Sequence, residues 1–409
     1  MRMAGIVPSD QPAAPRADSP AWRILMIAAC PFPAPQGSQV LVAGLAGALA
    51  EAGAEVWLLT YPGGVGQAPK GVSHLTCGGI GLKPRIRAGP WAGKLLLNQM
   101  LRASARWAIQ AESPGVIHAH NIEALRIAAP LARAAQIPVV YGVHGLMASE
   151  LPTYFGAWPV RQAARMLGQG LDRWAARRAD GFHALTQADA RALRALGVAP
   201  DRIHIGAPGM DVEAFDRVEP RLPPGISLGE GRPLIVYGGN LDGYQGLETL
   251  RRAFGRVRAH KPSAGLVLAS HHESGPYGRL RRRWAGEPGA QFARIRDFGE
   301  MKGLLTAADI LVNPRSTPGG FPVKLLNCMA AGKPIVSCRG SAGALEDGRD
   351  ALLVEDGDAE AFAASLLRLA EDGPLRERLG RAARQRVELE FRWEDRIKEL
   401  IAFYSRLRK

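Results

Sequence analysis

The stretch that decides the fold is Asp309 to Cys338, DILVNPRSTPGGFPVKLLNCMAAGKPIVSC. It opens on a short apolar run and passes through a loop that holds Gly319 and Gly320. A helical segment, PVKLLNCMAAG, then begins at Pro322, and proline is favoured at the first position of a helix. A second apolar run, PIVSC, closes the stretch. This order predicts a strand–helix–strand unit of a parallel sheet.

Similar units recur along the rest of the chain. The runs RILMIAAC, EVWLLTY, GVIHAHN, PVVYGVH and GFHALT form a first set, and LIVYGG, GLVLAS, DILVNP, PIVSC and ALLVE form a second. Runs that are apolar throughout, rather than alternating, indicate strands buried on both faces of a parallel sheet. The sequence therefore predicts an α/β protein with two Rossmann-like, doubly wound parallel-sheet domains facing a cleft, where ligands bind beyond the carboxyl ends of the strands.

The predicted boundaries follow composition. Residues 1–21 are rich in Pro, Ala and Asp and are expected to be disordered. Residues 22–218 form the first domain, and EPRLPPGISLGEGRP, residues 219–233, reads as a Pro/Gly-rich linker. Residues 234–392 form the second domain. A final helix over residues 393–409 is expected to pack back towards the first domain.

The composition limits the partners and the compartment. The 409 residues carry a net charge of +14, which indicates an anionic partner: a nucleic acid, a membrane surface or a phosphorylated substrate. No nucleic-acid-binding motif is visible, so nucleic acid is disfavoured. The four widely spaced cysteines argue for a reducing compartment and against a zinc or disulfide framework. With no membrane-spanning run and no signal core, the protein is expected to be cytoplasmic.

Neither domain has the glycine pattern of a dinucleotide fold or a P-loop after its first strand, which disfavours a dehydrogenase or an ATPase. The first loop, CPFPAPQGSQ, instead places Gly37 and Ser38 just before a helix of about 14 residues that ends near Gly53. The N–H groups at this helix start would suit an anion. The alternative is an ordinary strand–helix turn.

Several segments, taken in order, carry a resemblance. They are PFPAPQGS, LAGALAEAGAEVWLLT, VIHAHN, PVVYGVHGL, APGMDVEAF, AADILVNP, GFPVKLLNCMAAGKPIV and ALEDGRDALLVEDGD. From residue 23 to about residue 392 the chain resembles glycosyltransferase family 4, the retaining nucleotide-sugar transferases of GT-B fold. The resemblance implies a donor nucleotide bound mainly by the second domain, an acceptor bound by the first, and no metal.

The donor half departs from the family pattern. In the loop GGNLDGYQG, Asn240 and Gln245 stand where the family usually has an Arg and a Lys that hold the diphosphate. Gly319 and Asn327 replace two glutamates that contact the sugar and the ribose. An amide can still bind the ribose hydroxyls, whereas a glycine cannot replace a carboxylate. The sequence ASHHESGPYG stands in place of a glycine-rich turn, and His271, His272 or Glu273 could supply sugar contacts or, less favourably, a metal site.

The missing cations predict a relocated clamp. Lys324 lies in the first helical turn, where the helix dipole disfavours a cation unless an anion sits in front of it. Arg315, on the preceding loop, is a second candidate. Backbone N–H groups of residues 320–323, which include Gly320 and Phe321, would assist. The alternative is that Lys324 simply extends to solvent.

Histidines mark the first domain. His144 follows the strand PVVYGV, and the resemblance implies that it contacts the transferring sugar, as a neutral donor or as an imidazolium. His118 and His120 alternate along GVIHAHN and are expected to support it from one face of that strand. In the second domain, the resemblance places Asp297 and Phe298 near the nucleobase, although Phe298 is expected to be a core residue.

The expected function is a hexosyl-type transfer from a nucleoside-diphosphate sugar to a hydroxyl, with retention of configuration. The leaving diphosphate, held by Lys324, the Gly37 turn and helix dipoles, would help to deprotonate the acceptor. Domain closure would exclude water. The altered donor contacts keep two alternatives open: a GT-B nucleotide-sugar epimerase, and an inactive member that serves as a binding or scaffold subunit.

Two basic helices suggest where the protein works. Along KPRIRAGPWAGKLLLNQMLRASARW a polar stripe lies beside an apolar one; the polar stripe is Lys94, Asn98, Arg102 and Arg106, and the apolar one is Leu96, Met100, Ala103 and Trp107, helped by Leu97 and Leu101. WPVRQAARMLGQGLDRWAARRAD is a second basic helix. The alternative is an apolar stripe that faces the core. With the net charge, these helices favour peripheral attachment to the cytoplasmic face of the inner membrane and a lipid-linked or glycan acceptor of the cell envelope.

Overall fold

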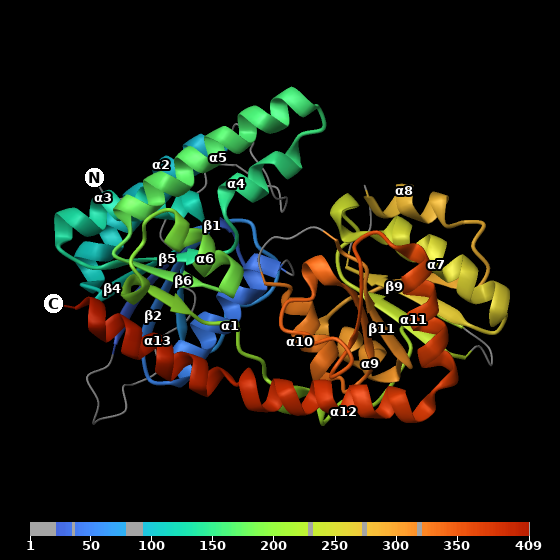
Figure 1. Ribbon diagram of the computed structural model, residues 1–409. Coiled ribbons are helices and arrows are strands. Elements are labelled where there is room, and N and C mark those ends of the chain that lie inside the picture. The colour runs from blue at the N-terminus through green and yellow to red at the C-terminus, as the bar shows by residue number, and fades with distance from the viewer. Residues whose placement is uncertain are drawn as a thin grey trace. The chain divides into compact units, whose positions relative to one another are not determined.

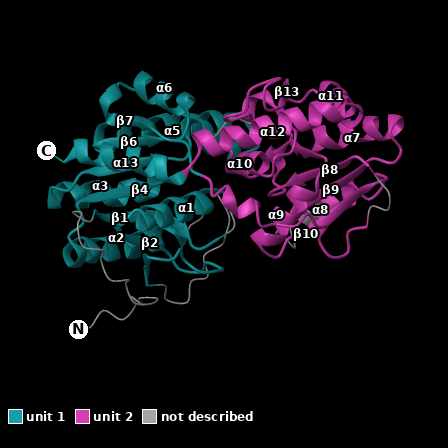
Figure 2. Cartoon of the chain, turned by 90° about the horizontal axis from the view of Figure 1, so that it is seen from below, with its two compact units in different colours: residues 1–209, 319–321, 393–409 teal, residues 210–318, 322–392 magenta. Residues whose placement is uncertain are grey.

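The computed structural model describes residues 22–34, 37–78, 93–227, 232–271, 276–316 and 321–408. The chain forms two compact units (Figure 2): unit 1 contains residues 1–209, 319–321 and 393–409, and unit 2 contains residues 210–318 and 322–392. The predicted disordered segment, residues 1–21, lies outside the described residues. All four cysteines are free thiols. None of the helices in the described ranges has the length and apolar character of a membrane span.

Unit 1 is built on a seven-stranded sheet in the order β3-β2-β1-β4-β5-β6-β7. The strands are β1 (Arg23–Pro31), β2 (Glu55–Tyr61), β3 (Val72–Thr76), β4 (Val116–His120), β5 (Val139–Val143), β6 (Gly181–Ala184) and β7 (Ile203–Ile205). Every pair of neighbouring strands runs parallel. The strand order reverses between β1 and β4, and sheets of this kind bind ligands at the carboxyl ends of such strands.

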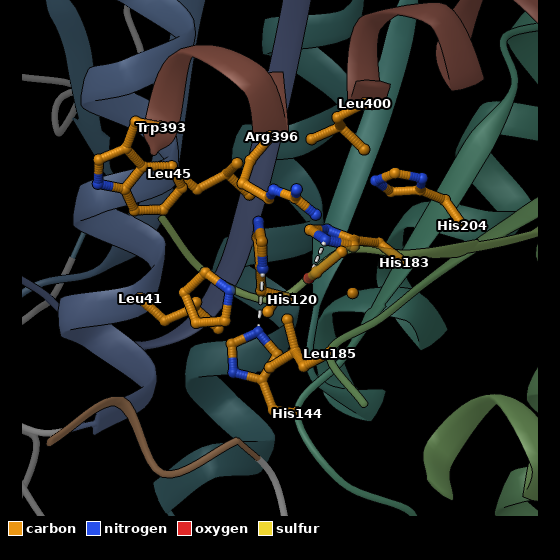
Figure 3. A pocket seen from close by; sticks show the side chains of 14 residues that line it. Leu41, Leu45, His120, His144, His183, Leu185, His204, Trp393, Arg396 and Leu400 are labelled. Carbon is orange, nitrogen blue, oxygen red and sulfur yellow. Dashed lines mark hydrogen bonds between the residues drawn. The ribbon is translucent and has the colours of Figure 1, made fainter. Parts of the chain in front are cut away.

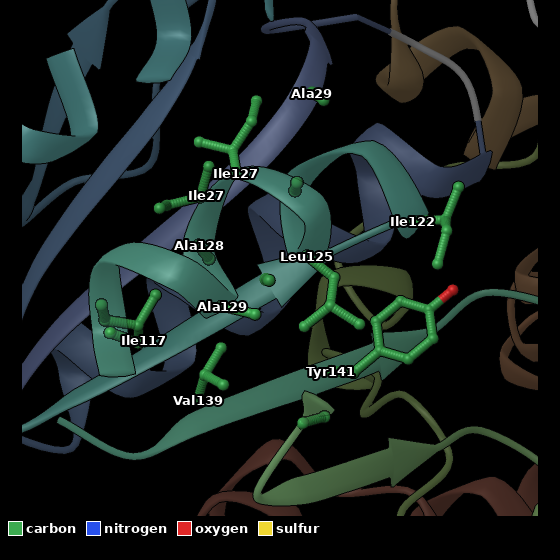
Figure 4. Close-up of a cluster of buried hydrophobic side chains, with 14 of the residues drawn as sticks. Ile27, Ala29, Ile117, Ile122, Leu125, Ile127, Ala128, Ala129, Val139 and Tyr141 are labelled. Atoms are coloured by element: carbon green, nitrogen blue, oxygen red, sulfur yellow. The ribbon is translucent and has the colours of Figure 1, made fainter. Parts of the chain in front are cut away.

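Helices cover both faces of this sheet (Figure 1). They are α1 (Gly37–Glu51), α2 (Gly93–Glu112), α3 (Ile122–Ala135), α4 (Met147–Glu150), α5 (Trp158–Arg178), α6 (Gln187–Ala195) and α13 (Trp393–Leu407), with 3₁₀ turns at Leu151–Tyr154 and Pro200–Arg202. On one face α2, α3, α5 and α6 share a core with Ile27, Ile117 and Tyr141 of the sheet. Figure 4 shows the part of this core between α3 and the strands β1, β4 and β5. On the other face α1 and α13 pack against Ile24 and Met26.

The last helix belongs to unit 1 because its apolar face is buried there. Ile397, Leu400, Phe403 and Tyr404 of α13 are at most 2% exposed and share a core with α1 and β1. Its first residue, Trp393, lies so close to α1 that a Cβ at Gly44 would collide with the indole ring. The final helix is therefore part of the core rather than a tail.

Unit 2 is built on a six-stranded parallel sheet in the order β10-β9-β8-β11-β12-β13. The strands are β8 (Leu234–Gly238), β9 (Gly265–Ser270), β10 (Ala290–Arg294), β11 (Ile310–Asn313), β12 (Ile335–Cys338) and β13 (Leu352–Val354). Its helices are α7 (Leu247–His260), α8 (Pro276–Arg283), α9 (Phe298–Ala307), α10 (Val323–Ala330), α11 (Ala359–Glu371) and α12 (Gly373–Glu390), with 3₁₀ turns at Glu213–Phe215, Gly243–Gln245 and Arg339–Ser341. The prediction of two doubly wound parallel sheets is thus confirmed.

The stretch quoted first is the unit β11–α10–β12. Strands β11 and β12 pair in parallel, with Leu311 opposite Ile335. Helix α10 begins at Val323, one residue later than expected, and Pro322 is its N-cap. Lys324 is therefore the second residue of the helix. Gly332, with a φ of +65°, lies just past its end, in the left-handed conformation that glycine adopts without strain.

Candidate functional site

The predicted donor residues of unit 2 lie on two loops that touch. One loop follows β8 and the other follows β11. Gly246 ends the first loop with a φ of +69°, and any Cβ there would collide with the carbonyl group of Pro314 on the second loop. Only glycine allows this approach. The contact brings Asn240 and Gln245 to the same place as Arg315 and the start of α10.

A chain of hydrogen bonds joins these residues. The Nζ of Lys324 donates to Oε1 of Gln245 at 2.8 Å, and Nε2 of Gln245 donates to Oδ1 of Asn240 at 2.6 Å. The Nδ2 of Asn240 then donates to the hydroxyl of Tyr244 at 2.9 Å. Tyr237 fixes the loop backbone by donating its hydroxyl to the Asn240 carbonyl at 2.5 Å. The two amides that replace the family's cations thus hold Lys324.

The Lys324 ammonium contacts two uncharged groups. It lies 4.8 Å from the centre of the Tyr237 ring, within the range of a cation–π contact, and its hydrogen-bond acceptor is the Gln245 amide. Burial lowers the pKa of Lys324 to about 7; Cys328 partly opposes this shift and Arg315 adds to it. The side chain therefore does not simply extend to solvent, as the alternative interpretation required.

Arg315 supplies a second cation on the β11 loop. Its guanidinium lies 5.3 Å from the centre of the Tyr244 ring, and burial lowers its pKa. Its backbone is fixed from below, because Ser341 donates its hydroxyl to the Arg315 carbonyl and Asn313 donates to the Ser341 hydroxyl at 3.0 Å. Two partly desolvated cations held by amides and aromatic rings form an arrangement that favours an anionic ligand.

The other predicted donor residues are less informative. Asn327 lies one turn after Lys324 in α10 and is half-buried, and Phe321, also half-buried, directly precedes Pro322. His271 follows β9. Gly319, Gly320, His272 and Glu273 lie outside the described residues. Within the described ranges, no group of three or more His, Cys, Asp or Glu side chains has the arrangement of a metal site.

Phe298 is not the core residue that the sequence predicted. It is the first residue of α9 and is 49% exposed. Its ring meets that of Phe215 edge-on at 6.4 Å, and Lys302 lies 5.5 Å from its centre. Asp297 caps the helix by accepting from the Glu300 N–H at 2.9 Å. The apolar residue therefore begins a capped helix at the surface instead of facing the sheet.

In unit 1 the histidines gather at the carboxyl ends of four strands (Figure 3). His120 ends β4 and bonds through Nδ1 to Nε2 of His144, which follows β5, at 3.1 Å. His118 stacks on His120 with 4.3 Å between ring centres, and its Nδ1 bonds to the Tyr404 hydroxyl at 2.7 Å. As predicted, His118 and His120 share one face of the strand.

A pocket opens beside these rings. It is lined by Leu41, Leu45, His120, Gly142, His144, His183, Leu185, His204, Gly206, Ala207, Pro208, Trp393, Arg396 and Leu400. His183, His204 and Arg396 were not among the predicted site residues. The only signal for His183 and His204 was a histidine within each of two short segments, GFHA and IHI, which is not enough to place a side chain, and no feature of the sequence indicated Arg396.

Two glycines make room for the rings. A Cβ at Gly142 would lie 2.9 Å from Nδ1 of His120 and 3.0 Å from Nε2 of His118. A Cβ at Gly206 would lie 2.7 Å from Nε2 of His204. Each distance is shorter than ordinary van der Waals contact allows. The histidine cluster therefore depends on glycine at both positions.

Burial keeps the histidines neutral. It lowers the pKa of His144 to about 4, that of His183 to about 4 and that of His204 to about 3. For His118 and His120, burial and the neighbouring histidines lower the pKa well below the usual range. Of the two roles open to His144, hydrogen bonding as a neutral imidazole is therefore favoured over that of an imidazolium near pH 7.

Two features of unit 1 differ in part from their predictions: the first loop and the basic helix α2. Gly37 and Ser38 are the first residues of α1 and both are exposed, and their role with an anion stays a prediction. In the polar stripe on α2, two of the four residues have partners within unit 1: Lys94 pairs with Glu123 at 2.9 Å, and Asn98 accepts from the Tyr61 hydroxyl at 2.5 Å.

The apolar stripe on α2 does not face the core. Leu96 and Trp107 are exposed, as is Ala103, whereas Met100 packs against the core. The buried side of α2 is instead formed by Leu97, Leu101, Ala105, Ala108 and Ile109. The alternative that the stripe is simply core-facing therefore fails for three of its four residues.

Comparisons with known proteins give a consistent result. A family model described as Glycosyltransferase Family 4 matches residues 35–214, and one described as Glycosyl transferases group 1 matches residues 232–372. Together the two models cover most of units 1 and 2.

Similar proteins include two curated relatives and a solved structure. D-inositol 3-phosphate glycosyltransferase 1 of Catenulispora acidiphila is 27% identical over 312 residues, covering 71% of each chain. The GDP-mannose-dependent monoacylated alpha-(1-6)-phosphatidylinositol monomannoside mannosyltransferase of Corynebacterium glutamicum is 29% identical over 214 residues, 49% of this chain and 55% of the relative. Anabaena Alr3699/HepE in complex with UDP-glucose superposes with a TM-score of 0.69 at 18% identity, covering 93% of this chain and 99% of that one.

Proposed function

Because the chain belongs to glycosyltransferase family 4, we propose that it transfers a hexose from a nucleoside-diphosphate sugar to a lipid-linked or glycan hydroxyl with retention of anomeric configuration. Glycosyl transfer from a nucleotide sugar is the activity of this GT-B family. The acceptor, the stereochemistry and the place of action are the proposed part.

The observation that carries the donor assignment is the environment of Lys324, whose buried ammonium donates to a neutral amide. A desolvated cation with a neutral acceptor is electrostatically incomplete, and a diphosphate would complete it. Negative charge grows on the leaving phosphate as the glycosidic bond breaks, so a cation placed there stabilises the transition state more than the ground state. In this proposal Lys324 and Arg315 supply the positive charge that an Arg and a Lys usually supply in the family, at the positions that Asn240 and Gln245 occupy here.

Retention is proposed from the family resemblance, and the proposed mechanism uses no nucleophile from the protein. Gly319 and Asn327 leave no carboxylate at the positions where the family usually has two glutamates, so a protein nucleophile is not the basis of the proposal. The leaving diphosphate oxygen would accept the acceptor's hydroxyl proton on the face from which it departs. The acceptor oxygen then bonds to the anomeric carbon from that same face. His144, as a neutral donor, would hold the transferred sugar.

The surface of unit 1 supports an acceptor at an anionic membrane. The helices of one layer, α2, α3, α5 and α6 (Figure 1), carry exposed arginines that form no ion pair with any described residue: Arg102, Arg106, Arg126, Arg133, Arg161, Arg165, Arg173, Arg177, Arg178, Arg191 and Arg194. Carboxylates on the same helices are engaged, since Glu123 pairs with Lys94 and Asp172 caps α4. The layer therefore presents uncompensated positive charge.

Apolar side chains are interspersed with this charge. Trp158, Val160, Met166 and Leu167 of α5 are exposed, as are Leu95, Leu96 and Trp107 of α2. Basic residues combined with exposed tryptophan and leucine are typical of surfaces that lie in a membrane interface. The corynebacterial relative, named for a phosphatidylinositol mannoside acceptor, supports the same proposal. We place the reaction at the cytoplasmic face of the membrane.

The experiment for the proposed function measures donor binding and turnover together. UDP-glucose and GDP-mannose are each added to the wild type, to Lys324→Ala and to the control Lys261→Ala, a half-buried lysine at the end of α7 in the same unit. A true donor should raise the melting temperature of the wild type and the control. Lys324→Ala should lose turnover on the order of 100-fold, the scale for one group at a developing charge.

Other results would point to other functions. No stabilisation by either nucleotide sugar, nor by a wider panel, would favour the inactive binding subunit. A nucleotide sugar converted to its epimer with no acceptor present would favour the epimerase. Wild-type turnover in Lys324→Ala would contradict the relocated cation clamp.

A further inference from the structure

In the hydrogen bond between His120 and His144, the shared proton can be bonded to either of two nitrogens. Nδ1 of His120 and Nε2 of His144 are 3.1 Å apart, and the rings meet edge-on with 5.3 Å between centres. Because both imidazoles are neutral, either His120 donates and His144 accepts, or the reverse. If His120 donates, the single proton of the His144 ring is on Nδ1, which lies on the side away from His120. If His144 donates, its proton is on Nε2 and its Nδ1 is bare.

The far nitrogen of His120 decides between these arrangements. Nε2 of His120 is buried and has no hydrogen-bond partner among the described residues. If the proton were on Nε2, it would be a buried N–H without an acceptor, which proteins avoid more strictly than a buried lone pair without a donor. The protein therefore gains by keeping the His120 proton on Nδ1.

Arg396 acts in the same direction. It lines the pocket into which His120 projects, and in Figure 3 its guanidinium lies on the side of His120 opposite His144. A guanidinium is always charged and only donates hydrogen bonds. The lone pair of a bare Nε2 is attracted by this cation, whereas an N–H at Nε2 would be repelled.

The surroundings prevent His120 from turning to another partner. Its ring stacks on His118 at 4.3 Å, and the Tyr404 hydroxyl holds His118 in turn. Gly142 lies against both rings, so closely that a Cβ at this position would be 2.9 Å from Nδ1 of His120. His120 is only 2% exposed. Its orientation is set by packing as well as by hydrogen bonding.

We propose that His120 is a positioning residue that holds His144 in the tautomer with its proton on Nδ1, so that His144 presents a neutral hydrogen-bond donor on the side away from His120. This inference rests on the proposed function, in which His144 contacts the transferred sugar. A neutral donor suits a sugar hydroxyl or a phosphate oxygen, and it needs no proton from solvent at each turnover.

The test reads the tautomer directly and then the turnover. Nitrogen NMR of the full chain labelled in histidine distinguishes protonated from bare ring nitrogens without any substrate, and the His144 signals are assigned by their loss in His144→Ala. The variants are His120→Asn, whose amide can donate from the place of Nδ1, and His120→Asp, whose carboxylate can only accept. His74→Asn, which changes a histidine of unit 1 on β3 that does not line this pocket, is the matched control.

We expect His144 of the wild type to carry its proton on Nδ1, and His120→Asn to preserve both this tautomer and the release of nucleoside diphosphate from UDP-glucose or GDP-mannose. His120→Asp should move the proton to Nε2 and lower turnover on the order of 100-fold, the scale for one misplaced donor. The control should match the wild type in both measurements.

A wild-type His144 protonated on Nε2 would overturn the proposal whether or not any variant folds. Equal turnover in His120→Asn and His120→Asp, with His144→Ala inactive, would also overturn it. If the tautomer switches as expected but His144→Ala retains full turnover, the tautomer assignment is supported and the proposed contact of His144 with the sugar is overturned instead.

Discussion

At the scale of single residues, the proposed contact of Lys324 with the diphosphate should make donor binding depend on pH. Burial lowers its pKa to about 7, and a bound diphosphate would raise that value because it favours the charged form. Below pH 7 the free protein already carries the charge, so affinity should be constant. Above pH 7 binding must take up a proton, and affinity should fall about tenfold per pH unit until the bound-state pKa is reached.

Calorimetry with UDP-glucose between pH 6 and pH 9 measures this effect. Proton uptake is detected by repeating the titration in buffers of different ionisation enthalpy. Lys324→Gln, which keeps a donor but cannot titrate, should bind more weakly and with a flat pH profile. A wild-type affinity that is constant across this range would show that the ammonium does not contact the diphosphate.

Restoring the residues that are usual in the family should not improve this site. In the double variant Asn240→Arg, Gln245→Lys, the acceptor that holds Lys324 at 2.8 Å is lost and a like charge takes its place. Repulsion between the two ammonium groups should offset the added attraction for the diphosphate. We expect little gain or a loss in kcat/KM, measured beside Asn240→Arg alone. A large rise would indicate that the natural site is a decayed version of the family pattern.

The sequence indicated Lys324 and the two amides of the candidate donor site but not the aromatic rings around them. Asn240, Gln245 and Lys324 could be related because spacing and resemblance place them on loops at one edge of a sheet. Tyr237, within an apolar run, is indeed a core residue, but the run does not indicate that its ring also contacts the ammonium. In the same way, His120 could be placed beside His144 but its hydrogen bond could not, because strand register and ring orientation are set by the tertiary fold.

At the scale of elements, sequence patterns found the interior strands of each sheet and one edge strand, β13 (Leu352–Val354), but missed the other three edge strands. The strands that were not predicted, β3, β7 and β10, all lie at the end of a sheet. They have three to five residues, and β3 and β10 are only partly buried. An edge strand has one neighbour and need not be apolar throughout, so it lacks the pattern that identified the central strands.

The arginine layer of unit 1 yields a prediction at this scale. Arg161→Gln, Arg165→Gln and Arg173→Gln together remove three charges from α5. Each basic residue near an anionic leaflet contributes about 1 kcal/mol, so the triple variant should bind anionic vesicles about 100-fold more weakly at low salt. Co-sedimentation with neutral and anionic vesicles measures the change.

The matched control removes the same charge from another surface. Arg281→Gln, Arg282→Gln and Arg283→Gln change three exposed arginines of α8 in unit 2 and should leave vesicle binding close to wild type. Equal losses in the two triple variants would mean that net charge alone drives attachment. If the wild type remains in the supernatant with both lipids, a soluble acceptor becomes the better assignment.

At the scale of the whole molecule, the buried histidines make unit 1 sensitive to acid. A histidine with a lowered pKa stays neutral in the folded state while its unfolded counterpart takes up a proton. Its contribution to stability is therefore complete above the unfolded pKa of about 6.5 and is lost as the pH falls towards the folded value. For His144 and His183, with pKa values of about 4, the loss by pH 4 is about 3 kcal/mol each.

The complete cluster amplifies this effect. His204, whose pKa falls to about 3, adds a loss in the same direction. Glu150, Asp172 and Asp189 act in the opposite sense, because burial raises the pKa of each carboxyl group. Unit 1 should therefore unfold between pH 6 and pH 4 by taking up several protons at once.

Circular dichroism during an acid titration, with hydrogen exchange mapped by mass spectrometry at the midpoint, measures where unfolding begins. Exchange should rise first in β4 to β7 of unit 1. His204→Phe, which retains an aromatic ring beside Phe403 at a site where the two ring centres are 5.5 Å apart, removes one titrating group and should lower the midpoint pH. His260→Asn on an exposed helix of unit 2 should leave it unchanged. If unit 2 exchanges first, or if His204→Phe has the midpoint of the wild type, the histidine cluster is not what limits stability in acid.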